Sequence, residues 1–301
     1  MPSGMVLGVA TAVAWGSSDF LARFAARAVG SVRALLGMQA WGALFVTSLM
    51  FFARDWGHLF DGSGWQPWAW GILAGAINTF GMLALYRAFE IGKLALVGPL
   101  SASYPVLTVI LSLLSGERLL LYRALGIVAA LAGVILVAAG EKAPEARATT
   151  EQTTGGRAGP RVTGIAGLNW AVAAACSFGI LFWLLGTRMI PRTGALATVC
   201  LIRLTGAAIT FSLVAARKIP LRIKNKRTSA RLYAMGLFDT GAFALSNLGM
   251  RVEQMSVISV LGSLYGAVTV AYAAVFLKER IALPQWVGIA AIFLGVALMN
   301  T

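Results

Sequence analysis

The chain has 301 residues, of which 58% are hydrophobic and only 12% charged, and its mean hydropathy is +0.79. Soluble domains carry roughly 25% charged residues, so this composition excludes an ordinary soluble protein and indicates an integral membrane protein. The net charge of +14 comes from basic residues in short connections between apolar segments, which favours loops facing anionic lipid headgroups over a nucleic-acid binder.

Apolar segments long enough to cross a membrane recur along the whole chain. A hydrocarbon core about 30 Å thick needs about 20 apolar residues, and continuous rather than alternating apolar runs predict helices. The ten predicted spans lie near residues 3–24, 32–53, 67–88, 94–115, 121–139, 163–186, 194–215, 231–250, 254–276 and 283–300. Residues 141–162 are polar and rich in Gly and Thr, which predicts a flexible linker between two five-helix units, 1–140 and 163–301.

The two halves resemble each other when the first is shifted by 161 residues. The matched pairs are Gly75 with Gly236, Asn78 with Asp239, Thr79 with Thr240, Tyr104 with Tyr265 and Thr108 with Thr269. Because each half has an odd number of predicted spans, the second copy enters the membrane from the opposite side. The sequence therefore predicts an all-α membrane protein built as two inverted repeats.

Three stretches resemble a known family. They are "AWGSSDF" in the first span, "YRAFEIGKLALVGPLSASYPVLTVILSLLSGERL" in the first half and "SVISVLGSLYGAVTVAYAAVFLKERIALPQWVGIAAIFLGVAL" in the second. They are similar to the two halves of EamA-type transporters in the drug/metabolite transporter superfamily. The resemblance implies a multi-pass protein of the inner or plasma membrane that moves small metabolites by alternating access. For many members it implies export of amino acids or related compounds.

Positive charge predicts an orientation that differs from the family's. The connections after odd-numbered spans contain 18 Lys and Arg residues, against 6 on the other side. The positive-inside rule then places both termini outside the cell, whereas the resemblance implies cytoplasmic termini.

Away from the span ends, three charged residues fall inside predicted spans, namely Asp19, Arg203 and Asp239. Such residues cost roughly 2.5 to 3.5 kcal/mol to insert, so they normally face the bundle interior. For Arg203 and Asp239, mutual neutralisation and contact with solute or a coupling proton are both open. Asp19 either faces the interior or reaches water at the span end. Because Asn78 is the counterpart of Asp239, we expect the two to face each other across a midplane cavity, with Asp239 as the group that exchanges a proton.

Polar and aromatic residues suggest a lining for that cavity. Tyr104 and Tyr265 belong to stripes of hydroxyl residues spaced along one helical face, which either line a pathway or hydrogen-bond neighbouring helices. Trp15 shares a face with Asp19, and the resemblance places the Trp-Gly of the first span near the pathway. The candidate solute-binding residues are Trp15, Asp19, Asn78, Tyr104, Arg203, Asp239 and Tyr265.

The alternatives to a transporter are a membrane-embedded lipid-modifying enzyme and a channel-like facilitator. The sequence has no HExxH motif, no phosphate-binding loop and no cluster of acids, and its single histidine, His58, lies in a connection. Neither a pore filter nor a charged ring is visible. We therefore expect no catalytic site, no metal and no cofactor. The expected partners are a small-molecule solute and membrane lipids, without nucleic acid, and a homodimer is left open.

Overall fold

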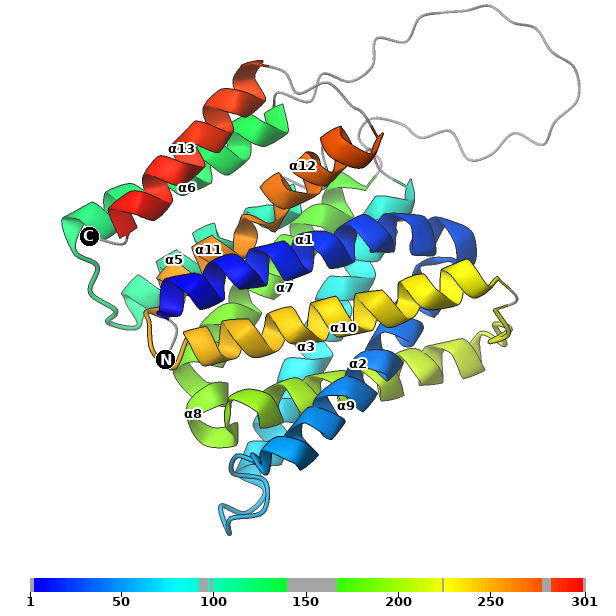
Figure 1. Cartoon of the computed structure of the whole chain (residues 1–301). Helices are drawn as coiled ribbons and strands as arrows, with labels where there is room; N and C mark the ends of the chain where they lie inside the picture. Colours follow the sequence, from blue (N-terminus) through cyan, green and yellow to red (C-terminus); the bar gives the residue numbers. More distant parts are fainter. Residues whose placement is uncertain are drawn as a thin grey trace, which may run out of the picture.

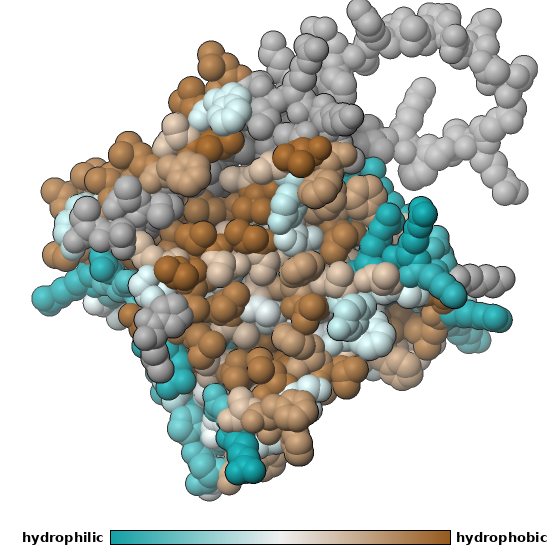
Figure 2. Space-filling view, viewed as in Figure 1, coloured by the Kyte–Doolittle hydropathy of each residue, from teal (hydrophilic) through white to brown (hydrophobic). Residues whose placement is uncertain are grey.

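The computed structural model describes residues 3–91, 97, 100–139, 167–223, 225–277 and 283–299. Within these ranges every regular element is helical (Figure 1). The predicted linker at 141–162 lies outside the described residues. Figure 2 shows apolar side chains over the middle of the molecule and hydrophilic ones gathered at its ends, as a membrane-spanning protein requires. Which end is cytoplasmic stays a prediction.

The helices follow the predicted spans closely. The first half contains α1 (Gly4–Val29), α2 (Ser31–Ala53), α3 (Gln66–Ile91), α5 (Tyr104–Leu114) and α6 (Leu121–Ala139). The second half contains α7 (Leu168–Leu184), a π-helical turn η1 (Leu185–Met189), α8 (Ile190–Thr193), α9 (Ala195–Ala216), α10 (Lys226–Gly249), α11 (Met255–Ser263), α12 (Tyr265–Leu277) and α13 (Leu283–Met299).

Length and composition identify five clear membrane-crossing helices among the described residues. They are α1, α2, α3, the continuous segment Leu168–Thr193 and α9, and four shorter apolar segments accompany them. The helix α10 has 24 residues but is less apolar, because it carries Asp239 and several basic residues. The count of ten spans therefore stays a prediction, while the all-helical membrane fold is confirmed.

The two halves run in opposite directions. Arg33, near the start of α2, donates a hydrogen bond of 3.3 Å to the carbonyl of Pro220, which follows the end of α9. Thr47, near the end of α2, lies 3.5 Å from the sulfur of Cys200 near the start of α9. Since α2 and α9 occupy equivalent places in the two halves, their antiparallel packing is the inversion that the sequence predicts.

Contacts between the halves are reciprocal. The helix α1 packs on α10 as α7 packs on α3, α2 packs on α10 as α9 packs on α3, and α1 packs on α12 as α7 packs on α5. Such paired contacts are what a two-fold axis generates. Figure 1 shows α6 and α13, another equivalent pair, side by side at the edge of the bundle.

Two glycines fix the register between α2 and α9. Gly30 and Gly194 join consecutive helices with nearly the same backbone angles, φ 83° and ψ 154° against φ 94° and ψ 153°. Positive φ of this kind favours glycine because a Cβ atom would clash. These glycines are 164 positions apart, so Gln39 is the counterpart of Arg203, and Gly42 is the counterpart of Gly206.

The predicted spans 94–115 and 254–276 are interrupted at equivalent points. Ser103 ends one turn with an N–H···O bond of 3.4 Å to Leu100, and Leu264 does the same with a bond of 3.2 Å to Leu261. Helix α5 then begins at Tyr104 and α12 begins at Tyr265. Pro105 lies in the first turn of α5, where its missing N–H costs little, so it starts a helix rather than kinking one.

Candidate solute-binding site

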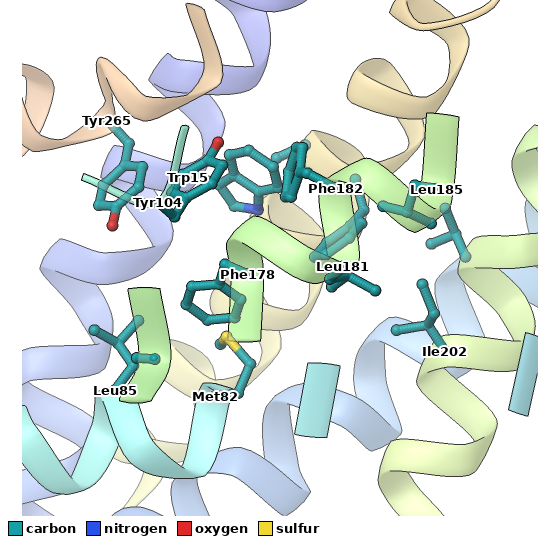
Figure 3. Close-up of a cluster of buried hydrophobic side chains, with 14 of the residues drawn as sticks. Trp15, Met82, Leu85, Tyr104, Phe178, Leu181, Phe182, Leu185, Ile202 and Tyr265 are labelled. Atoms are coloured by element: carbon teal, nitrogen blue, oxygen red, sulfur yellow. The ribbon is translucent and has the colours of Figure 1, made fainter. Parts of the chain in front are cut away.

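A cavity of about 40 Å³ lies between the two halves. Six helices contribute its walls, and the lining residues are Trp15, Asp19, Met82, Leu85, Tyr104, Phe178, Phe182, Asp239, Phe243 and Tyr265. Figure 3 shows the rings of Trp15, Tyr104, Phe178 and Phe182 gathered at this place, with Met82 beside Phe178.

The cavity lies on the pseudo-two-fold axis. A Cβ atom at Gly16 would be 3.0 Å from the carbonyl oxygen of Tyr265, and one at Gly179 would be 3.0 Å from that of Tyr104. This reciprocity sets a shift of 163 residues between α1 and α7. Eight lining residues form four equivalent pairs. At this shift Trp15 pairs with Phe178 and Asp19 with Phe182, and at the shift of 161 Met82 pairs with Phe243 and Tyr104 with Tyr265.

Aromatic rings in the walls contact one another closely. The ring of Trp15 lies 5.6 Å from that of Phe182 and 5.3 Å from that of Phe243 between centroids, both edge to face. Tyr104 and Phe182 are 4.8 Å apart. Contacts of this kind favour a defined arrangement of the rings.

The two tyrosines line the cavity and also join helices. The Tyr104 hydroxyl donates a bond of 2.9 Å to the carbonyl of Ser259, and the Tyr265 hydroxyl lies 3.2 Å from that of Ser101. Thr108, in the same stripe as Tyr104, donates to the carbonyl of Gly179 at 3.2 Å. The hydroxyls therefore connect helices while the rings of the two tyrosines face the cavity; that the stripes line a solute pathway stays a prediction.

Arg203 and Asp239 form a buried ion pair. Arg203 Nη2 donates to Asp239 Oδ2 at 2.7 Å, and the arginine side chain is fully buried. Its Nη1 donates to Gln39 Oε1 at 3.2 Å, and its guanidinium carbon lies 5.1 Å from the ring centre of Phe243. Arg203 stands behind the cavity wall, and Asp239 both pairs with it and lines the cavity.

Asp19 faces the same cavity without a partner. It is half-buried and lies one helical turn beyond Trp15. In the described part of the chain, no hydrogen bond or ion pair reaches its carboxylate. Because Arg203 is paired with Asp239, Asp19 has no counter-ion among the described residues.

The structure places Asn78 away from the cavity. Its side chain is fully buried, and neither amide atom has a hydrogen-bond partner among the described residues. The wall from α3 is made instead by Met82 and Leu85, one to two turns further along the helix. Asn78 and Asp239 therefore do not face each other across the cavity, because the lining surface of α3 begins beyond Asn78.

Comparison with known proteins agrees with this architecture. The sequence model of the EamA-like transporter family matches residues 2–139 and 165–301, once for each half. The chain belongs to the EamA-like transporter family. A solved structure described as "Crystal structure of protein" has the same fold, with a TM-score of 0.73 at 20% identity over 98% of this chain and 95% of the other. None of the curated proteins matches the sequence.

Six residues of this EamA-like transporter were not anticipated at the site. Five line the cavity and one bonds to Arg203; they are Met82, Leu85, Phe178, Phe182, Phe243 and Gln39. The repeat relates three of them, Phe178, Phe182 and Gln39, to predicted residues, but at shifts of 163 and 164 that only the structure reveals. Applying the shift to Trp15 and Asp19 leads to Phe178 and Phe182, although the residue types differ.

Proposed function

We propose that this EamA-like transporter is a secondary active transporter that exports small metabolites across the inner or plasma membrane. The observation that carries the proposal is the cavity on the pseudo-two-fold axis, walled by equivalent residues of two inverted halves. Inverted repeats allow one conformation of each half to be exchanged for the other, which opens a central site to the two sides of the membrane in turn.

The cavity is narrow in this conformation, with a volume of about 40 Å³ between close-packed aromatic rings. Solute binding requires the walls to separate. The helix interruptions at Ser103 and Leu264 adjoin the two wall tyrosines, so they are suitable places for that movement.

At one end of the molecule, hydrogen bonds between polar side chains join the two halves, and they would have to break during transport. Arg123, at the start of α6, donates to Glu253 at 2.7 Å and to Gln254 at 3.0 Å in the connection between α10 and α11. Gln254 in turn donates to the carbonyl of Arg118 at 2.9 Å. The Arg123–Glu253 pair is only partly buried, so its rupture costs little compared with rupture of Arg203–Asp239.

Proton coupling fits Asp19 better than Asp239. Arg203 donates a bond of 2.7 Å to Asp239, so this carboxylate already has a partner of opposite charge. Among the described residues Asp19 has no such partner, and it interacts electrostatically with Asp239, Tyr86 and Tyr265. A carboxylate that lines the cavity and can be neutralised by a proton is able to couple solute movement to a proton gradient.

Metabolite release from cells that overproduce the protein, followed by transport in proteoliposomes with an imposed pH gradient, tests this function. We expect release of at least one small metabolite above the level of cells producing Asp239→Ala. In proteoliposomes we expect Asp19→Asn to abolish the dependence of transport on the gradient. Unchanged gradient dependence in Asp19→Asn would exclude this residue as the coupling group.

A further inference from the structure

We propose that the central cavity selects organic cations, with Asp19 holding the cationic group of the solute and the aromatic walls holding its apolar part. This inference rests on the proposed function, because it names the class of solute for the same site.

The balance of charge is the first argument. Three acidic or basic side chains lie in or directly behind the walls, and Arg203 is already paired with Asp239 at 2.7 Å, which leaves the carboxyl group of Asp19 without a counter-ion among the described residues. An unpaired carboxylate in this wall is costly unless it takes up a proton or a positive charge approaches it. A solute cation supplies that charge, whereas a solute carboxylate would meet repulsion from Asp19 and find no free cation among the described lining residues.

The aromatic walls are the second argument. Six of the ten lining residues carry rings, namely Trp15, Tyr104, Phe178, Phe182, Phe243 and Tyr265. The face of an aromatic ring is electron-rich and attracts ammonium and guanidinium groups. The molecule already shows this geometry, since the Arg203 guanidinium lies 5.1 Å from the ring centre of Phe243.

A shortage of free polar groups is the third argument. The hydroxyls of Tyr104 and Tyr265 are engaged by Ser259 and Ser101, so the polar groups left in the walls are the indole N–H of Trp15 and the two carboxylates. A sugar or another neutral polyol would replace only a few of its hydrogen bonds to water here. An amphipathic amine loses little, because its one charged group meets Asp19.

Three probes that share an indole ring test the proposal in proteoliposomes, namely tryptamine as the cation, tryptophan as the zwitterion and indole-3-acetate as the anion. We expect half-saturation by tryptamine at a concentration at least about tenfold lower than by the other two, as one ion pair with ring contacts would give. Asp19→Asn should remove this preference. Asp19→Glu, which keeps the charge, should retain it.

The matched control is Asp61→Asn. Asp61 is an exposed carboxylate in the loop between α2 and α3, bonded to Ser63 and His58. The hydrogen bond from the Ser63 hydroxyl, assisted by His58, lowers the pKa of Asp61 to about 2, so the control removes a charge that is present at the assay pH. We expect the preference for tryptamine to be unchanged in this variant.

The outcomes separate the two proposals. Transport of tryptophan or indole-3-acetate as readily as tryptamine, or a preference that survives in Asp19→Asn, overturns cation selectivity and leaves the transport function standing. Movement of none of the three probes in the wild-type protein overturns cation selectivity; the metabolite-release experiment then decides the transport function separately.

Discussion

The two halves place the same backbone geometry around different chemistry. In the second half, Arg203 on α9 and Asp239 on α10 form a buried ion pair of 2.7 Å. At the equivalent places in the first half stand Gln39 on α2 and Asn78 on α3, whose amide nitrogens have no partner in the described part of the chain. The comparison teaches that the axis organises the fold, while the charge that a solute would meet is arranged asymmetrically.

Gln39 connects the two halves. It does not bond to Asn78 in its own half, and its Oε1 instead accepts a bond of 3.2 Å from Arg203 in the other half. Arg203 therefore has partners from both halves directly behind the cavity wall. Any movement of one half against the other must change this contact.

The largest expected effect comes from removing the charge of the second half. Arg203→Gln leaves Asp239 buried without its partner, so we expect the free energy of unfolding to fall by about 3–5 kcal/mol. Thermal unfolding of the purified protein in detergent measures the loss.

The double variant Arg203→Gln with Asp239→Asn gives the second half the residues of the first. Because no unpaired charge then remains, we expect it to regain most of the lost stability. A double variant as unstable as Arg203→Gln would show that the bonds of Arg203 to Gln39 and Phe243, rather than its charge, hold the helices.

A smaller difference in stability is expected between alanine variants of the equivalent glycines Gly42 and Gly206. A Cβ atom at Gly42 would lie 2.2 Å from Thr240 Oγ1, on a short β-branched side chain. One at Gly206 would lie 2.2 Å from Gln39 Nε2, the flexible end of a longer side chain without a bond at that atom. Overpacking typically costs about 1–3 kcal/mol, so we expect Gly42→Ala near the upper limit and Gly206→Ala near the lower one. Equal melting temperatures for the two variants would contradict this asymmetry.

Much of the architecture could be predicted from the sequence because long apolar runs have few alternatives. The pairing of Arg203 with Asp239 was one of two interpretations left open, and the prediction succeeds because a buried charge requires a partner. The pairing of Tyr104 with Tyr265 followed from a direct match between the halves at a shift of 161.

The rest of the site was hidden by divergence and by loop lengths. The shift is 163 between α1 and α7 and 164 between α2 and α9, so the single shift of 161 does not align either helix pair correctly. At the correct register Asp19 meets Phe182 and Arg203 meets Gln39, pairs that share no chemistry. The structure reveals them through the close approaches at Gly16 and Gly179 and the matching backbone angles of Gly30 and Gly194. The misplacement of Asn78 has the same origin, because a matched position in the repeat was taken as a matched role.

The smallest effect is expected at Asn78 itself. Its side chain is fully buried and its amide has no protein partner among the described residues, so the polar atoms contribute a desolvation cost without a compensating bond. Asn78→Leu, of similar volume, should therefore leave the melting temperature unchanged or raise it, in contrast to the loss expected for Asp239→Leu. If Asn78→Leu instead destabilises the protein as strongly as Asp239→Leu, Asn78 belongs to a polar network in the first half that is the counterpart of the ion pair. The two halves would then differ in charge but not in the presence of a stabilising polar network.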